Sequence, residues 1–459
     1  MVMRPVTSWG RVLWPMQELA SLPSGDASLL RLDDIGFDAS DVARTGARRS
    51  MLPRGNGRSY GDCNLNPGGI LLEMQQFNRV MEFDPDGGVL TCEAGLLLSD
   101  LLQLFVPRGW FLPVTPGTQF VTVGGAIAND VHGKNHHRAG SFGNHVLQFE
   151  LLRSDGSRRV CSPMQHSDWY EATIGGLGLT GLITWARVQL RRIANPCIDA
   201  ETIRFRSLEE FFDISMASDQ SHEHTVSWID CASSGQGLAR GIFNRGNHAP
   251  RAEGGEPVAH RLSPEAMSLP WRVPFTPPFS LINPLSLKAF NWAYFHLRRG
   301  DRKCSVQHYR PFFYPLDAVQ EWNRIYGPKG FYQYQCVLPP AHALPGIRTM
   351  LNTIALSGMG SFLAVLKQFG APASRGMLSF PMPGTTLALD FPNRGARLHH
   401  LFEALDGIVL DAGGRLYPAK DGRMSEAVFK AGYPRWQEFA AYVDPSFSSA
   451  FWRRVMGLA

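Results

Sequence analysis

The segment between Pro116 and Asn144 restricts the fold of this chain more than any other, and it reads PGTQFVTVGGAIANDVHGKNHHRAGSFGN. Its glycines are Gly117, Gly124, Gly125, Gly133, Gly140 and Gly143. Glycine lets a backbone come close to a ligand, and successive main-chain N–H groups in such loops form concave anion sites. A mobile surface loop would be polar throughout, whereas apolar Val121, Ile127 and Val131 lie between these glycines. The pattern therefore predicts an ordered, buried loop that cradles a ligand.

A second glycine cluster lies upstream and reads PRGNGRSYGD from Pro53 to Asp62. Its third glycine is misplaced for the dinucleotide fingerprint G-x-G-x-x-G, and no long amphipathic helix follows. The cluster also lacks the Gly-Lys-Ser/Thr ending of a phosphate-binding P-loop. A nucleotide bound by this chain would therefore require a different fold.

Composition describes a globular protein with a large core, at 459 residues, 44% hydrophobic and 19% charged. The net charge of +5 is mild and arginine is scattered, which argues against nucleic-acid binding. The seven cysteines contain no CxxC pair, so we expect neither a disulfide framework nor a metal site. The sequence shows no signal peptide and no apolar run long enough for a transmembrane helix. We expect a cytoplasmic protein, or one peripheral at the inner membrane.

Short apolar runs alternate with turn residues from Leu52 to Leu190 and predict strands, with one helical repeat from Leu96 to Phe105. The pattern predicts an α+β domain over residues 1–195, with a boundary at Pro196. A strand-rich region over 196–412 follows, and 413–459 ends the chain. Residues 250–299 form a proline- and aromatic-rich insert that is nearly free of acid. Two interpretations stay open for the insert: a long lid or partly disordered loop, and a surface that meets a lipid interface.

Both glycine clusters resemble the FAD-pyrophosphate loops of the vanillyl-alcohol oxidase / p-cresol methylhydroxylase flavoprotein superfamily. Within it, the runs VTSWGR, HGKNHHRAGSFGNHV, EWNRIYGPKGFYQYQ and RLYPAKDGR are similar to the decaprenylphosphoryl-β-D-ribose oxidase family, essentially end to end. The resemblance implies a two-domain fold, in which residues 413–459 return to the FAD domain and a sheet-based substrate domain is inserted between. It also implies oxidation of the ribose 2-hydroxyl of a polyprenyl-phosphate sugar to a ketone, after which a partner short-chain reductase completes epimerisation to the arabinose donor.

The resemblance assigns the cofactor site residue by residue. The first loop is implied to cradle the pyrophosphate with Arg54, Gly55, Asn56, Gly57, Arg58, Ser59, Tyr60, Gly61 and Asp62. Beyond it, the residues implied to line FAD are Gly117, Thr122, Val123, Gly124, Gly125, Asn129, His132, Ile183 and Tyr417. Relatives that bind FAD covalently through this loop carry histidine in a G-x-G-H-S pattern, where this chain has Arg58. Since a guanidinium cannot form that bond, we expect non-covalent FAD.

Lys420 is the first choice for the catalytic position, because the family's essential lysine occupies the matching Tyr-x-x-Lys-Asp segment. His132 is the second choice, near the flavin ring. Without the resemblance, Lys420 would be interpreted as a solvated lysine in a turn and His132 as an isolated core histidine. The residues implied to line the substrate pocket are Tyr60, Lys134, Tyr314, Gln333, Gln335, Lys367 and Thr386, with Lys134 placed to meet phosphate.

One departure concerns the segment before Asp390-Phe391-Pro392, where mycobacterial members carry Asn-x-Cys and this chain carries Thr386-Leu387-Ala388. Ala388 supplies no thiol, so inhibitors that trap that cysteine should fail here, and the lipid chain or sugar can differ.

Two alternative functions remain open. One is an aldonolactone oxidase of the same superfamily, against which the missing flavin-linking histidine and the aromatic insert argue. The other is a flavin-free binding or scaffold module, which would be colourless.

Overall fold

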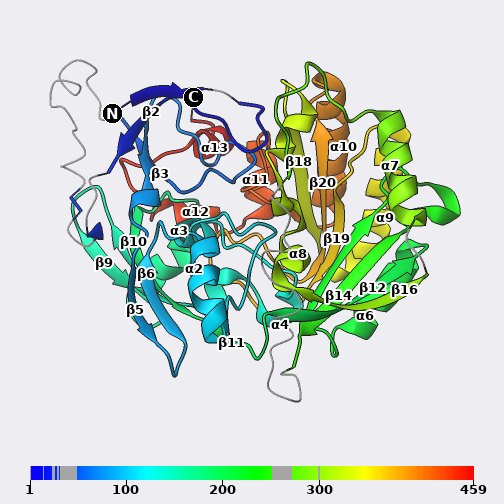
Figure 1. The fold of residues 1–459 in the computed structure, drawn as a ribbon. Helices are drawn as coiled ribbons and strands as arrows, with labels where there is room; N and C mark the ends of the chain where they lie inside the picture. Colours follow the sequence, from blue (N-terminus) through cyan, green and yellow to red (C-terminus); the bar gives the residue numbers. More distant parts are fainter. Residues whose placement is uncertain are drawn as a thin grey trace.

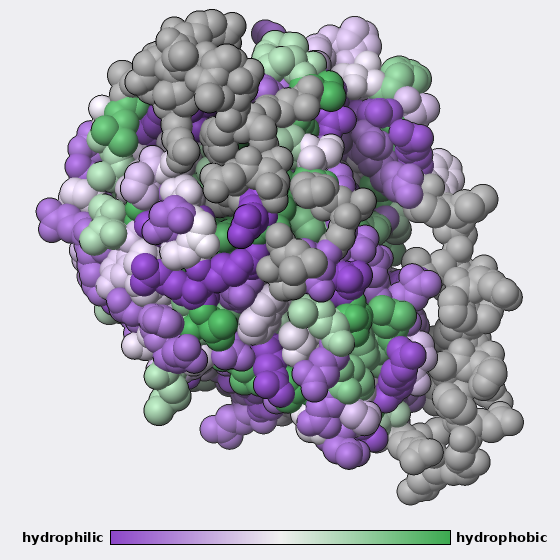
Figure 2. Space-filling model, turned by 90° about the vertical axis from the view of Figure 1, so that its left-hand side faces the viewer, coloured by the Kyte–Doolittle hydropathy of each residue, from purple (hydrophilic) through white to green (hydrophobic). Residues whose placement is uncertain are grey.

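The computed structural model describes residues 2–13, 15–22, 26–27, 30–31, 49–250, 271–297 and 300–458. Two sheet-based halves lie side by side (Figure 1). The half at the left is built from the early part of the chain, and the half at the right carries one large sheet with helices packed on it (Figure 1). Figure 2 shows the outer side of the left half, where hydrophilic residues predominate and apolar residues are divided into small areas.

The left half contains two sheets and a short strand pair. The four-stranded sheet has the order β1 (Val2–Pro5), β2 (Met16–Ser21), β4 (Ile70–Glu73), β3 (Met51–Arg54), with parallel pairing of β4 to both neighbours. The five-stranded antiparallel sheet has the order β5 (Val80–Asp84), β6 (Val89–Glu93), β10 (Leu182–Gln189), β8 (Val146–Leu152), β9 (Arg158–Cys161). Strands β7 (Trp110–Phe111) and β11 (Arg191–Arg192) form the pair.

The right half is an eight-stranded antiparallel sheet. Its order is β16 (Arg302–His308), β12 (Cys197–Phe205), β14 (Gly241–His248), β13 (His224–Ile229), β19 (Ala364–Phe369), β20 (Gly384–Pro392), β18 (Phe331–Leu338), β21 (Arg415–Leu416). A separate parallel pair joins β15 (Trp271–Arg272) to β17 (Val319–Gln320). Side chains alternate between the two faces along these strands. Tyr334, Leu366 and Leu389 belong to the hydrophobic core shared with the helices, whereas their immediate neighbours along each strand face the other way.

Helices cover the core face of the eight-stranded sheet. They are α6 (Leu208–Ser218), α9 (Pro340–Ser357) and α10 (Ala396–Asp411). Helix α6 begins at its N-cap Ser207, whose side chain accepts a hydrogen bond from the Glu210 amide. The remaining helices are α2 (Leu98–Phe105), α3 (Val123–Ala128), α4 (His136–Ala139), α5 (Ser167–Thr173), α7 (Pro284–His296), α8 (Tyr309–Phe313), α11 (Glu426–Gly432), α12 (Trp436–Ala440) and α13 (Ala450–Val455).

Helix α11 packs on β21 and α10, and the chain then returns to the left half with α12 and α13 (Figure 1). The amide of Met51 donates to the Ser446 carbonyl at 2.6 Å, and the amide of Ala450 donates to the Leu65 carbonyl at 2.8 Å. This C-terminal segment begins in the right half, where β21 pairs with β18 through Leu416 and Cys336. Residues 413–458 therefore link the two halves.

Most predicted elements agree with the structure, and two segments differ. The helix expected over Leu96 to Phe105 is α2, which buries Leu98, Leu101, Leu102 and Phe105 on one face. The segment expected to be a loop contains a short helix, α3. Thr122 caps it, with its hydroxyl accepting from the Gly125 amide, and Gly124 lies so close to Ala94 that a Cβ would be 3.0 Å from the Ala94 Cβ. Close packing explains the helical glycine.

The aromatic insert is only partly described, because residues 251–270 lie outside the described ranges. The described part, residues 271–297, is ordered into β15 and α7. Helix α7 begins with Asn283 as N-cap and Pro284 at the first helical position. Tyr294 and Phe295 of α7 pack against Trp228 and Ile242 of the eight-stranded sheet, on the face opposite α9 and α10. This part of the insert is therefore a helix packed on the sheet, not an irregular loop.

Candidate active site

A cavity of about 830 Å³ lies between the two halves and has walls from both. Its walls include, from the left half, Arg54, Gly55, Asn56, Gly57, Arg58, Ser59, Tyr60, Gly117, Thr122, Gly124, Gly125, Asn129, His132, Lys134 and Ile183. From the sheet and the returning segment come Gln333, Gln335, Lys367, Thr386, Tyr417 and Lys420. The fold thus brings most of the predicted cofactor and substrate residues to one cavity.

The two glycine segments meet at one wall of this cavity. The side-chain amide of Asn56 donates to the Phe120 carbonyl at 2.8 Å. A Cβ on Gly55 would lie 2.4 Å from the Thr122 hydroxyl, so only glycine allows this approach. Gly57 has a φ of +62°, a backbone conformation that glycine adopts at little cost. The two glycine segments therefore form a continuous main-chain surface.

Buried polar atoms in this wall lack partners within the described part of the chain. They are Nε of Arg54, Nε of Arg58 and Oδ1 of Asn129. Burying such groups without a hydrogen bond costs about 1–3 kcal/mol each, so a polar ligand is expected to satisfy them. Guanidinium groups and main-chain amides are the donors that suit a diphosphate. The residues present therefore fit a dinucleotide such as FAD.

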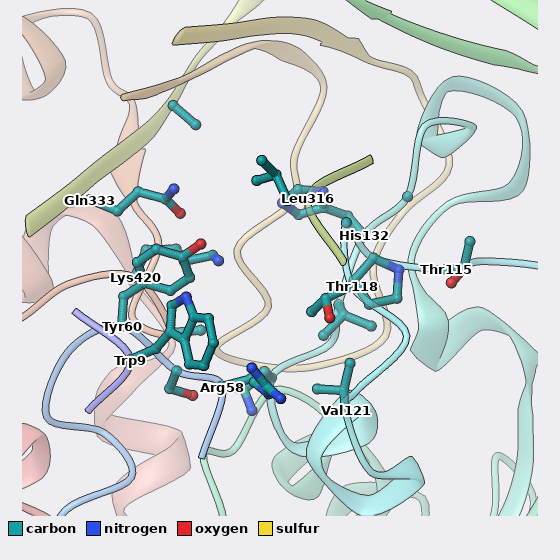
Figure 3. A pocket seen from close by; sticks show the side chains of 18 of the residues that line it. Trp9, Arg58, Tyr60, Thr115, Thr118, Val121, His132, Leu316, Gln333 and Lys420 are labelled. Carbon is teal, nitrogen blue, oxygen red and sulfur yellow. The ribbon is translucent and has the colours of Figure 1, made fainter. Parts of the chain in front are cut away.

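Lys420 projects into the cavity from the turn that follows β21 (Figure 3). Its Nζ lies 3.6 Å from the centroid of the Tyr60 ring, and Tyr60 is held there because its amide donates to the Ala419 carbonyl at 2.9 Å. Burial lowers the pKa of Lys420 to about 8, against the opposing charge of Asp390. An amine with this pKa can lose and regain a proton near neutral pH.

His132 faces Lys420 from the other side of the cavity (Figure 3). Its Nδ1 lies 3.0 Å from Nζ of Lys367, and its Nε2 lies 3.0 Å from the side-chain amide of Gln335. Burial, with the charge of Lys367, holds the pKa of His132 well below its usual range, so the imidazole is neutral. Nζ of Lys367 and Nε2 of Gln335 face the two ring nitrogens, and a neutral imidazole accepts a hydrogen bond at only one of them, while the other carries the ring proton.

Two further lysines give the cavity positive charge. Nζ of Lys367 donates to the Gly133 carbonyl at 2.7 Å. Nζ of Lys134 donates to the Phe312 carbonyl and lies 4.7 Å from the centroid of the Phe312 ring. Burial lowers the pKa of both lysines to about 7. Across the described residues neither lysine forms an ion pair, so an anionic group of a ligand is the natural partner.

We expect the buried Lys367 to make stability depend on pH. Its folded-state pKa of about 7 lies below the ordinary value of 10.5, so between these values the unfolded chain binds more protons. The free energy of unfolding must then rise with pH, by up to about 1.4 kcal/mol per pH unit for one such lysine. Urea unfolding at pH 7 and pH 9 gives the increase in the free energy of unfolding per pH unit. This increase should be smaller by about 1 kcal/mol per unit in Lys367→Met than in the wild type. An unchanged slope would contradict the depressed pKa.

Four predicted residues lie outside the cavity walls. Val123 is buried in the core of the left half. The Tyr314 hydroxyl is behind the wall, where it hydrogen-bonds the Thr115 hydroxyl at 2.5 Å. Gly61 contacts the returning segment, and Asp62 pairs with Arg454 at 2.7 Å. These residues support the site from behind.

Sequence reasoning missed several residues of the site. The Trp9 ring stacks beneath the Arg58 guanidinium, at 4.2 Å, and Thr115, Asp317 and Trp228 also belong to the walls. Asp390 is buried behind the wall, where its Oδ1 accepts from Nε2 of Gln333 at 2.5 Å. Burial raises the pKa of Asp390 to about 7. Strand alternation could have identified Asp390, because it shares one face of β20 with Thr386 and Ala388.

The floor of the cavity is the second face of the eight-stranded sheet. Gln335, Ala388, Val365 and Trp228 lie opposite one another on neighbouring strands, and all four line the cavity. Ala388, which stands in place of the family cysteine, therefore forms part of the cavity floor. No His, Cys, Asp or Glu cluster suited to a metal ion occurs in the described ranges.

Comparison with known proteins agrees with this geometry. The sequence pattern of a family described as an FAD binding domain matches residues 41–162. Decaprenylphosphoryl-β-D-ribose oxidase from Mycolicibacterium smegmatis is 38% identical over 443 residues, which is 94% of each chain. An uncharacterised protein from Streptomyces coelicolor is 32% identical over 374 residues, 78% of this chain and all of its own length. L-gulonolactone oxidase from Mus musculus is 31% identical over 137 residues, only 29% of this chain and 30% of its own.

These similarities confirm the flavoprotein fold and FAD as the cofactor. The lactone oxidase matches less than a third of the chain, whereas the ribose oxidase matches 94% of it. The chain therefore belongs to the decaprenylphosphoryl-β-D-ribose oxidase family and is an FAD-dependent oxidoreductase.

Proposed function

We propose that this enzyme oxidises the ribose 2-hydroxyl of a polyprenylphosphoryl-β-D-ribose to the 2-keto sugar, the first step of epimerisation to an arabinose donor. The observation that carries the proposal is the similarity to the M. smegmatis oxidase over 94% of both chains. A cavity lined by the two glycine segments, by Lys134 and Lys367 and by the aromatic residues Phe290 and Tyr294 suits a substrate with a sugar, a phosphate and an apolar chain. We expect a short-chain reductase to complete the epimerisation.

Bound FAD supplies a hydride acceptor for the carbon that carries the hydroxyl. We assign removal of the hydroxyl proton to Nζ of Lys420, because its pKa of about 8 makes the neutral amine available near neutral pH. Neutral His132, with Gln335, orients the sugar, and Lys134 and Lys367 attract the phosphate. Tyr60 holds Lys420 in place through its ring.

FAD is proposed to be bound non-covalently, because Arg58 stands where covalent relatives carry the linking histidine. The Arg58 guanidinium stacks on Trp9. We assign residues 1–195 and 413–459 to FAD binding and residues 196–412 to substrate binding. The sheet composition supports this division, because every strand of the eight-stranded sheet except β21 lies within 196–412. Denaturation of the purified protein should release free FAD.

The lipid chain of the substrate is proposed to reach the cavity past α7. Phe290 and Tyr294 of α7 line the cavity. Exposed apolar residues cover the outside of the same segment, and this α7 surface consists of Trp271, Phe275, Phe279, Leu281, Leu285 and Trp292. Residues 271–297 contain no Asp or Glu, but they include Arg272 and Lys288. No helix in the described part of the chain is long and apolar enough to cross a bilayer.

We therefore expect the α7 surface to hold the enzyme peripherally on a membrane. Trp271→Ser/Trp292→Ser should bind vesicles of anionic phospholipid at least about 10-fold more weakly than the wild type, because insertion of an aromatic ring contributes about 1.5–3 kcal/mol. Sedimentation with vesicles measures this. Met164→Ser is the control, since Met164 is 95% exposed between β9 and α5 in the left half, whereas α7 lies on the right half (Figure 1). Equal binding of all three proteins would contradict the assignment.

The substrate assignment is tested by rapid-mixing measurement of flavin bleaching with a panel of polyprenyl-phosphate sugars and aldonolactones. We expect bleaching with polyprenylphosphoryl-ribose and none with lactones. The aldonolactone alternative gains support only from bleaching by lactone alone.

A further inference from the structure

Arg454 of α13 joins two buried carboxylates that come from distant parts of the chain. Its Nε donates to Oδ2 of Asp62 at 3.0 Å, and its Nη2 donates to Oδ1 of Asp62 at 2.7 Å. The same Nη2 donates to Oδ2 of Asp421 at 3.0 Å. The side chains of Asp62 and Asp421 are only 6% and 7% exposed. Arg454 does not line the cavity.

Each carboxylate lies beside a residue of the site. Asp421 directly follows Lys420, and Asp62 follows Tyr60 by two positions. Between them the two segments touch, because a Cβ on Gly61 would lie 1.4 Å from the Asp421 carbonyl oxygen. The position of Nζ of Lys420 over the Tyr60 ring therefore depends on the contact between Gly61 and Asp421, which the ion pairs of Arg454 stabilise.

The charges explain why an arginine is needed at this point. Burial raises the pKa of Asp62, and the negative charge of Asp421 adds to this effect while Arg454 opposes it. Arg423, two residues after Asp421, pairs with Asp406 at 2.6 Å instead. In the described ranges, no other side chain forms an ion pair with Asp62 or Asp421. Loss of the arginine would leave two buried carboxylates that repel each other across the Gly61 contact.

We infer that Arg454 is a positioning residue: it clamps the segment that carries Tyr60 to the segment that carries Lys420, and so fixes the lysine amine at the reacting end of the cavity. The effect of this clamp on catalysis rests on the proposed role of Lys420, whereas the contacts of Arg454 with Asp62 and Asp421 do not depend on that role. A single arginine that is planar and bidentate can hold both carboxylates at once, whereas a lysine offers one compact charge.

The variant Arg454→Met tests the clamp in the FAD-loaded enzyme. A displacement of about 1 Å at a catalytic group can lower the rate about 100-fold. We therefore expect the limiting rate of flavin reduction to fall about 10- to 100-fold, while FAD content and the substrate concentration for half-maximal rate change less than about 3-fold. Arg454→Lys should recover part of the rate. Arg435→Met is the matched control, because Arg435 pairs with the exposed Glu171 and Glu438 and should react normally.

Hydrogen exchange provides a readout that does not depend on turnover. The amide of Asp421 donates to the Tyr417 carbonyl, and the amide of Met424 donates to the Asp421 carboxylate. In Arg454→Met, peptides that span residues 58–64 and 417–425 should exchange faster, while peptides from β18 stay unchanged. Faster exchange throughout the protein would mean a general loss of stability and would overturn the clamp.

The double variant Asp62→Asn/Arg454→Met separates positioning from charge neutralisation, and it keeps the test open if the single variant folds poorly. Removing one carboxylate relieves the repulsion, so FAD content should match the wild type while flavin reduction stays slow. Full recovery of the rate would overturn the inference, as would a normal rate in Arg454→Met. If instead Lys420→Ala reduces flavin normally, the proposed function of Lys420 fails, and the exchange measurement still decides whether Arg454 clamps the two segments.

Discussion

Lys420→Ala should bind FAD and fold like the wild type, yet its flavin should be reduced by polyprenylphosphoryl-ribose about 100- to 10,000-fold more slowly, since that is the contribution of a positioned acid–base group. The amine lies in the cavity over the Tyr60 ring and carries a pKa of about 8. Methyl at this position cannot take the hydroxyl proton. Rapid-mixing absorbance of the flavin in a single turnover measures the effect without interference from the electron acceptor.

Lys430→Ala is the matched control for this experiment. Lys430 lies ten positions further along the same returning segment, on α11, and pairs with Glu426. Its removal should leave flavin reduction unchanged, because it does not line the cavity. A wild-type rate in Lys420→Ala would refute the catalytic assignment, while a loss of FAD would show that the lysine holds the cofactor instead.

Gly124→Val should weaken FAD binding by about 10- to 100-fold, because overpacking of a tight contact costs about 1–3 kcal/mol. A Cβ at this position would lie 3.0 Å from the Ala94 Cβ and 3.1 Å from the Ala94 carbonyl oxygen. The Gly124 amide also donates to that carbonyl at 2.7 Å. The added side chain must therefore displace α3 from the wall where the two glycine segments meet. The ratio of absorbance at 450 nm to 280 nm after purification reports FAD occupancy, since oxidised flavin absorbs near about 450 nm.

Gly407→Val provides the comparison for this substitution. Gly407 is also a helical glycine, in α10, but nothing lies within 4 Å of a Cβ built there. Valine is a better helix former than glycine, so this variant should retain both stability and FAD. Full FAD occupancy in Gly124→Val would contradict the cradle formed by the two glycine segments.

The ligand loop between Pro116 and Asn144 could be predicted from its residues, because glycine at that density with apolar neighbours is typical of a buried ligand loop, whereas its pairing with the segment Pro53 to Asp62 was implied only by the family resemblance. The strands and α2 followed from periodicity, which depends only on the side-chain alternation of a sheet or the repeat of a helix. Lys420 is different. Nothing in its local pattern separates it from a surface lysine, so only resemblance to a family located it.

Other features were hidden for physical reasons. The short helix α3 contradicts the low helix propensity of glycine, and its origin is a close approach to Ala94, a residue distant in sequence. Trp9 reaches the cavity through a contact with Arg58 that no local pattern encodes. The ion pair between Asp62 and Arg454 spans almost the whole chain. Long-range contacts of this kind depend on topology, which a single sequence specifies only indirectly.

The return of α12 and α13 to the left half has a consequence for biosynthesis. Both glycine segments leave the ribosome well before Tyr417, Lys420 and Arg454. Contacts between such distant residues form late, because a long loop must close before they contribute. Coenzyme capture is therefore expected to follow the synthesis of α13, and a truncated polypeptide that ends before α11 would expose an incomplete, apolar binding surface to chaperones.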